Sequence, residues 1–157
     1  MAFGTTELIE GARKARQNFL KHIDGITEEQ AAWKPYPECK SIAETLDHLH
    51  WSDRATVEYA RSGQEPDYTS VPSKPPTESI DTLKAKLAES HADLMRYFET
   101  EFAGKPLDTI CKFYGQPTSI GDSLTYICNE EGYHTGQAAF IRMATDPTWD
   151  YYTAIYG

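Results

Sequence analysis

Two side chains that could bind a metal ion lie four residues apart near the C-terminal end of the chain, Glu130 and His134. The stretch that contains them reads LTYICNEEGYHTGQAAFIRM and has the apolar spacing of an α-helix. Side chains four apart on a helix are offset by about 40° and lie about 6 Å apart. Burying a carboxylate and an imidazole without a partner is costly, so a divalent metal with a third ligand elsewhere is one candidate.

Spacing alone leaves the roles of the remaining histidines and acids open. His48 and His50 fall in one predicted helix but point about 160° apart, so only one of them can face the core. We expect His48 to face inward and His50 outward. His91 is either a fourth ligand, a group behind the ligands, or a structural histidine hydrogen-bonded to a neighbour, which is the more common case. Glu131 lies about 100° around the helix from Glu130, and we expect it on the surface.

Four long amphipathic helices would position these groups. Apolar residues recur at helical spacing over Thr5 to His22, Ser41 to about Arg61, Ser79 to about Phe102, and Leu124 to Met143. A short turn, Thr27 to Trp33, connects the first two. The economical arrangement is an all-α four-helix bundle that forms a single domain over residues 1–157.

Local signals mark where these helices begin and which face they bury. Ser41 starts a capping box, Thr77 is expected to cap the third long helix, and Thr118 or Ser119 the fourth. In the fourth helix the buried stripe is expected to run through four apolar or aromatic positions. These are Tyr126, Ile127, Ala138 and Ile141.

The connections also carry information. Four prolines between Gln64 and Pro76 predict an irregular, long crossover between the second and third long helices. The segment KFYGQPT, residues 112–118, could form a short extended piece. The tail after Ala144 is rich in tyrosine and tryptophan, so we expect it to pack on the bundle or on a second subunit.

Charge and composition narrow the possible partners and location. The formal net charge of -9, with no basic cluster, argues against nucleic acid and anionic membranes as partners. The absence of a long apolar run argues against a signal peptide or membrane span, which predicts a cytoplasmic protein. Three widely spaced cysteines, Cys39, Cys111 and Cys128, are expected to be free thiols.

Two segments together resemble the DinB-like superfamily, bacterial four-helix-bundle metalloproteins related to bacillithiol transferases and mycothiol-dependent maleylpyruvate isomerases. The first is ITEEQAAWKPYPECKSIAETLDHL, residues 26–49, and the second is EEGYHTGQAAFIRM, residues 130–143. In the family, a segment ending L-x-H is paired with H-x-x-x-H-x-G-Q on the last helix. The resemblance implies His48 and His134 as metal ligands, with Glu130 at the position of the family's middle histidine.

This departure at Glu130 has two possible outcomes. A carboxylate can replace an imidazole, which gives a His2Glu set of the kind that holds catalytic zinc in other proteins. Alternatively the site has lost its metal and Glu130 forms a charge-assisted hydrogen bond to a histidine. We predict a retained site for a divalent metal, zinc or nickel first, with manganese or iron also compatible with mixed nitrogen and oxygen ligands.

The resemblance implies a metal-dependent transferase or hydrolase that acts on a small molecule, with a low-molecular-weight thiol as a possible cosubstrate, and a homodimeric assembly. No catalytic residue beyond the ligands is assigned. The alternatives are a non-catalytic bundle that binds a metal or small ligand, and a metal-free dimeric interaction module.

Overall fold

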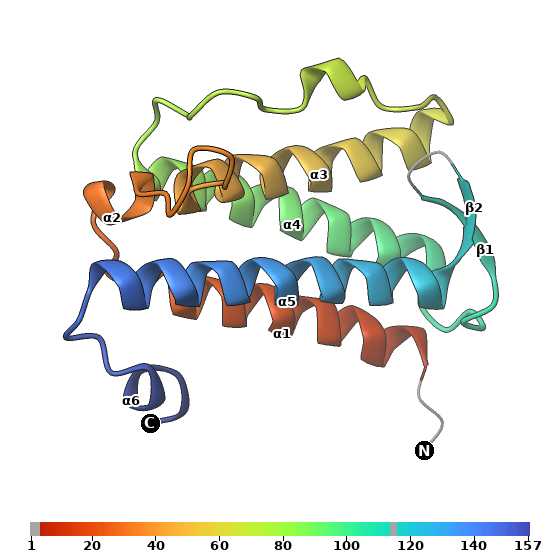
Figure 1. The fold of residues 1–157 in the computed structure, drawn as a ribbon. Helices are drawn as coiled ribbons and strands as arrows, with labels where there is room; N and C mark the ends of the chain where they lie inside the picture. Colours follow the sequence, from red (N-terminus) through yellow and green to blue (C-terminus); the bar gives the residue numbers. More distant parts are fainter. Residues whose placement is uncertain (1–3, 114–115) are drawn as a thin grey trace.

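Four long helices form a bundle in the computed structural model, which describes residues 4–113 and 116–157 (Figure 1). They are α1 (Thr5–His22), α3 (Ile42–Ser62), α4 (Ile80–Phe102) and α5 (Ile120–Thr145). The tightest pairs are α1 with α5 and α3 with α4, whereas α3 and α5 touch only sparsely. The long crossover, residues 63–79, runs along α3 and contains a short 3₁₀ turn, η1 (Tyr68–Ser70). The predicted fold class is therefore confirmed.

Serine side chains begin three of the four long helices. Ser41, Ser79 and Ser119 each accept a hydrogen bond from a backbone N–H in the first turn. The prediction that Thr77 caps the third long helix is wrong, because the Ser79 hydroxyl oxygen satisfies the N–H of Thr82. The helix that carries Glu130 begins at Ile120, directly after Ser119, which was one of its two predicted caps.

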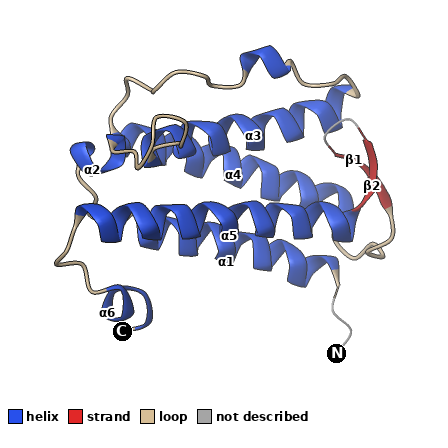
Figure 2. Cartoon of the chain, viewed as in Figure 1, coloured by secondary structure: helices blue, strands red, loops and turns tan. Residues whose placement is uncertain are grey.

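A small hairpin closes one end of the bundle (Figure 2). Its strands β1 (Ile110–Phe113) and β2 (Gln116–Ser119) pair antiparallel, with Ile110 opposite Ser119. The predicted extended segment 112–118 falls on these strands, except for Tyr114 and Gly115, which lie outside the described residues. Cys111 and Phe113 point into the core and anchor the hairpin there.

The connector and the tail cover the other end of the bundle. The connector contains α2 (Glu28–Ala32), and the tail ends in α6 (Tyr151–Tyr156), which packs against α1. Trp149 and Tyr151 both contact the buried ring of His22, with centroid distances of 6.3 and 5.7 Å. The prediction that the aromatic tail packs on the bundle is confirmed. Within the described chain, no helix is both long enough and apolar enough to cross a membrane.

The core consists of two apolar clusters with a polar layer between them. One cluster, around Leu94, Phe98 and Leu124, lies toward the hairpin; the other, around Phe19, Leu46 and Leu83, lies toward the connector. Between them, each long helix contributes buried polar side chains. These include Arg16 from α1, Asp53 from α3, Ser90 and His91 from α4, and Glu131 and His134 from α5. The candidate functional residues lie in or beside this layer.

Candidate metal site

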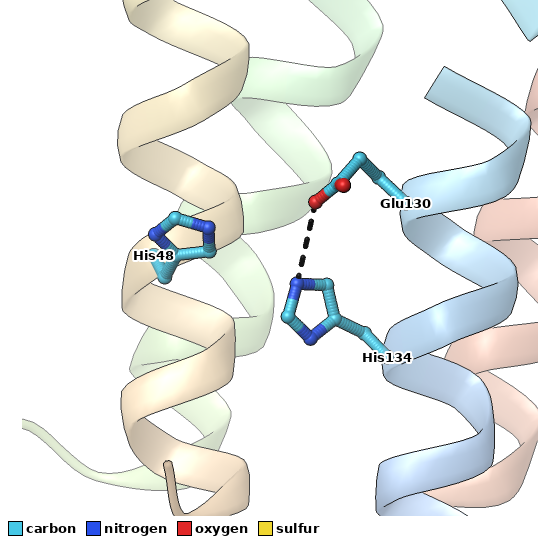
Figure 3. Close-up of side chains that lie close together, drawn as sticks. All are labelled: His48, Glu130 and His134. Atoms are coloured by element: carbon cyan, nitrogen blue, oxygen red, sulfur yellow. Dashed lines mark ion pairs between the residues drawn. The ribbon is translucent and has the colours of Figure 1, made fainter. Parts of the chain in front are cut away.

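His48 from α3 meets Glu130 and His134 from α5, two helices that contact each other only sparsely (Figure 3). One potential ligand atom from each residue lies within 4.8 Å of the others. His134 Nε2 is 3.6 Å from Glu130 Oε2, and the two imidazole rings are 5.6 Å apart between centroids. The structure therefore brings together the three residues that the sequence singled out, including the inward orientation of His48.

A hydrogen bond orients the His134 ring. Its Nδ1 lies 2.8 Å from Gln137 Oε1, one helical turn further along α5. An amide oxygen can only accept, so Nδ1 is the donor in this contact. The other ring nitrogen, Nε2, faces Glu130. An outer partner that fixes the tautomer in this way is typical of metal-ligating histidines.

His48 is held in the neutral form that a metal ligand requires. Burial lowers its pKa to about 4, and the neighbouring charges of Lys40 and His134 act in the same direction. Its Nδ1 atom is buried without a hydrogen-bond partner among the described residues. Such an orphaned atom costs free energy unless a ligand or water satisfies it. Two neutral imidazoles and a carboxylate form a donor set that fits a divalent transition metal.

The other two histidines proposed near the site have different surroundings. His50 is half-buried rather than exposed, because its Nδ1 contacts the backbone oxygen of Lys86 on α4 at 3.1 Å. His91 is buried in the polar layer and does not belong to the metal-ligand group. The expected hydrogen bond from His91 to a neighbour is not found within the described chain, since both ring nitrogens lack a partner. Burial, reinforced by the charges of Arg16 and Arg13, lowers its pKa to about 3.

Glu131 was expected on the surface, and this is wrong. It is only 1% exposed and forms an ion pair with Arg16 of α1. The reason is that α5 lies between two helices: Glu130 points toward α3 while Glu131, about 100° further round, points toward α1. For the same reason Tyr126, assigned to the buried stripe, is 45% exposed, whereas Ile127, Ala138 and Ile141 are buried as expected.

Arg16 and Asp53 complete a buried ionic cluster that the sequence reasoning missed. The Arg16 guanidinium donates to both Asp53 oxygens, at 3.0 and 3.3 Å, and also to Glu131 Oε1. Ser90 donates to Asp53 Oδ2 at 3.2 Å. Burial raises the pKa of Asp53 to about 6, against the opposing effect of Arg16. The available signal was the placement of Arg16 between Ala12 and Phe19 on an apolar helix face.

Comparison with known proteins agrees with the fold. The sequence profile of the DinB superfamily matches residues 12–138, so the chain belongs to this superfamily. The matched segment contains His48, Glu130 and His134. No curated protein matches the sequence.

Two solved structures are similar in fold. One is a DinB-like protein from Bacillus cereus ATCC 10987, with a TM-score of 0.71 and 17% identity over 92% of this chain and 95% of that chain. The other is a conserved protein from Enterococcus faecalis, with a TM-score of 0.61 and 18% identity over 90% of this chain and 96% of that chain.

Proposed function

We propose that this protein holds a divalent metal ion with His48, Glu130 and His134 and uses it to act on a small molecule. The observation that carries the proposal is a preorganised donor set on two helices, in which Gln137 fixes the proton of His134 on the nitrogen away from Glu130. Zinc or nickel suits this set best, and manganese or iron is compatible with it.

Three protein ligands leave a coordination position for a further group. A bound metal would supply Lewis acidity that lowers the pKa of a coordinated thiol or water. Burial keeps the His48 imidazole neutral. Glu130 provides one negative charge, and its side chain is 35% exposed and thus open to solvent. Glu131 is bound to Arg16 and shielded from solvent, so it is not available as a general base.

The reaction class follows from the family rather than from the geometry. The resemblance to bacillithiol transferases and mycothiol-dependent isomerases supports transfer to or from a low-molecular-weight thiol, or a related hydrolysis. A homodimer and a cytoplasmic location belong to the same proposal. A bundle that binds a metal or small ligand without turnover is the alternative.

Metal content tests the proposal. Protein purified without chelator should contain close to one equivalent of divalent metal by plasma mass spectrometry. Glu130→Gln keeps the shape but removes the ligand charge, so metal content should fall at least about tenfold. Glu130→His should retain or strengthen binding of zinc and nickel. Glu58→Gln, an exposed acid on α3, is the matched control and should behave like the parent.

Two results would contradict this metal site. If the parent holds under about a tenth of an equivalent after supplementation with zinc and nickel, the retained site is wrong. If Glu130→Gln keeps its metal, Glu130 only orients His134.

Turnover separates the enzyme from the binding protein. The metal-loaded parent is assayed with 1-chloro-2,4-dinitrobenzene and either cysteine or bacillithiol. An enzyme should exceed the rate of His134→Gln by at least about tenfold, since that variant loses a ligand. Equal rates for parent and variant with both thiols would count against thiol transfer.

A further inference from the structure

A groove runs beside the candidate metal site, between the connector and α5. Its volume is about 520 Å³, within the range of small-molecule pockets. Three exposed aromatic side chains form most of its walls. They are Tyr36 from the connector and Tyr133 and Phe140 from α5, which are 68%, 63% and 56% exposed. Exposed aromatic side chains gathered around one hollow are typical of a binding surface rather than an ordinary solvated face.

The groove shares a wall with the metal site. Gln137 lines it and is also the residue whose Oε1 binds His134 Nδ1. The Tyr133 ring contacts the His134 ring edge-on, with centroids 5.1 Å apart. Lys40 lines the groove and is close enough to His48 for its charge to act on that imidazole. A molecule seated in the groove would therefore lie next to the metal ligands.

The groove combines an apolar lining with one positive charge. Lys40 is exposed and makes no ion pair with any described residue. In a chain of net charge -9, a free ammonium at the rim favours an anionic group on the occupant. Between the aromatic walls, the floor includes Gly136, where an added Cβ would meet nothing within 4 Å. The hollow is therefore open at the helix backbone.

We propose that this groove binds the substrate of the metal site, and that the substrate is a small molecule with a planar apolar body and one carboxylate. The body lies between Tyr36, Tyr133 and Phe140, and the carboxylate pairs with Lys40. Calling the bound molecule a substrate rests on the proposed function, but binding in the groove does not require the metal. A second copy of this chain is the competing occupant, and the mass measurement below distinguishes it from a small molecule.

Calorimetric titration with 2-naphthoate, and with 2-naphthamide as its neutral counterpart, tests the groove. Both are titrated into the protein as purified and after treatment with a chelator. For a ligand of this size we expect a Kd of about 1 mM or tighter for naphthoate in both preparations. Naphthamide should bind about 3–10-fold more weakly, since it lacks the charge that pairs with Lys40. In isotope-labelled protein, naphthoate should also shift the ring resonances of His134.

Two variants place the ligand in the groove, each with a matched control. Gly136→Leu puts a side chain into the open floor and should weaken naphthoate binding at least about tenfold. Gly132→Leu, one turn away with equally free surroundings but outside the groove, should bind like the parent. Lys40→Gln should reduce naphthoate binding to the level of naphthamide and leave naphthamide unchanged, and Lys40→Arg should restore it. Lys74→Gln, on the exposed crossover, is its control.

Several results would overturn the inference. Equal affinities of the parent for naphthoate and naphthamide would refute the carboxylate, and unchanged binding by Gly136→Leu would refute the groove. A fall from dimer to monomer mass in Gly136→Leu by light scattering would show that a second copy occupies it. The same measurements test the proposed function separately. If the protein binds naphthoate but never holds metal, the proposed function is wrong and the groove stands. If it binds metal but not naphthoate, only the groove is refuted.

Discussion

Two polar clusters lie side by side in this bundle, and they compensate the negative charge of their carboxylates in opposite ways. In the inner cluster, Arg16 supplies the cation for Asp53 and Glu131. In the outer cluster, Glu130 faces the two imidazoles of His48 and His134 and pairs with no lysine or arginine of the described chain. Glu130 and Glu131 are neighbours in sequence, so the difference comes from the helix that each one faces. One cluster is complete within the protein, and the other is built to take a cation from outside.

Solvent access differs in the same sense. The side chains of Arg16, Asp53 and Glu131 are 3%, 6% and 2% exposed, whereas that of Glu130 is 35% exposed. A cavity of about 20 Å³, room for about one water molecule, lies between the clusters and is bordered by Asp53, Glu130 and Glu131. An exchangeable ion needs a path to solvent, while a structural charge pair is stronger without one. The comparison predicts that the inner cluster governs stability and the outer one governs ligand binding.

The largest effect should come from breaking the inner cluster. Arg16→Met leaves two buried carboxylates without a cation, so the free energy of unfolding should fall by about 3–5 kcal/mol in urea titrations. The matched control is a triple variant that adds Asp53→Leu and Glu131→Leu. It removes the charges together and should recover most of the loss. A loss below about 1 kcal/mol for Arg16→Met would show that the inner cluster contributes little.

Metal removal should have the next largest effect. With free metal at 100 to 1,000 times its Kd, binding stabilises the native state by about 2.7–4.1 kcal/mol. Chelation should remove this amount in the parent, as measured by the shift in thermal midpoint. In His134→Gln, chelation should change the midpoint by less than about 1 °C, because there is little bound metal to remove. An equal shift in both proteins would place the stabilising metal elsewhere.

A pH titration should separate the clusters through their histidines. The pKa of His91 falls from about 6.5 in the unfolded chain to about 3 in the native protein, so the unfolded state takes up the proton first. The stability from this group is therefore complete above pH 6.5 and is lost as the pH falls toward 3. His48, with its pKa near 4, acts in the same direction, whereas the raised pKa of Asp53 opposes both between about pH 4 and 6.

His91→Phe isolates the inner contribution. Because His91 would contribute about 2 kcal/mol of the stability lost between pH 7 and pH 4.5, the variant should show that much less pH dependence in urea titrations. His50→Phe provides the comparison: burial lowers the pKa of His50 too, but this imidazole is only half-buried, so the variant should lose less of the pH dependence. An unchanged slope for His91→Phe would mean that His91 titrates normally.

The smallest effect should come from an ion pair of the same chemistry outside the core. Arg13 and Glu99 are 2.8 Å apart, but their side chains are 33% and 47% exposed. Water screens this pair, so Arg13→Gln should change the free energy of unfolding by less than about 1 kcal/mol. Measured beside Arg16→Met, three residues along the same helix, it shows how far burial amplifies an arginine–carboxylate contact. Equal losses of unfolding free energy in Arg13→Gln and Arg16→Met would show that burial does not strengthen this contact.

Much of this architecture was accessible from the sequence. The apolar periodicity predicted four helices, caps at Ser41 and Ser119 marked the starts of two of them, and the prolines predicted the crossover, because these signals depend on local backbone geometry. The spacing of Glu130 and His134 placed them together on one helix face, and the family pattern supplied His48. Caps were predicted less evenly: α5 begins directly after Ser119, one of its two predicted caps, whereas α4 is capped by Ser79 and not by Thr77.

The tertiary structure decided which neighbour each helix face meets. A periodic pattern gives the angle between Glu130 and Glu131 but not the helices on either side, so the burial of Glu131 could not be predicted from it. Likewise, the partnership of Arg16 with Asp53 joins residues 37 positions apart, and the groove joins the connector to α5. Local sequence determines helices and their faces. The burial and pairing of charges depend on how those faces pack, because desolvation and Coulomb energies are set by neighbours in space.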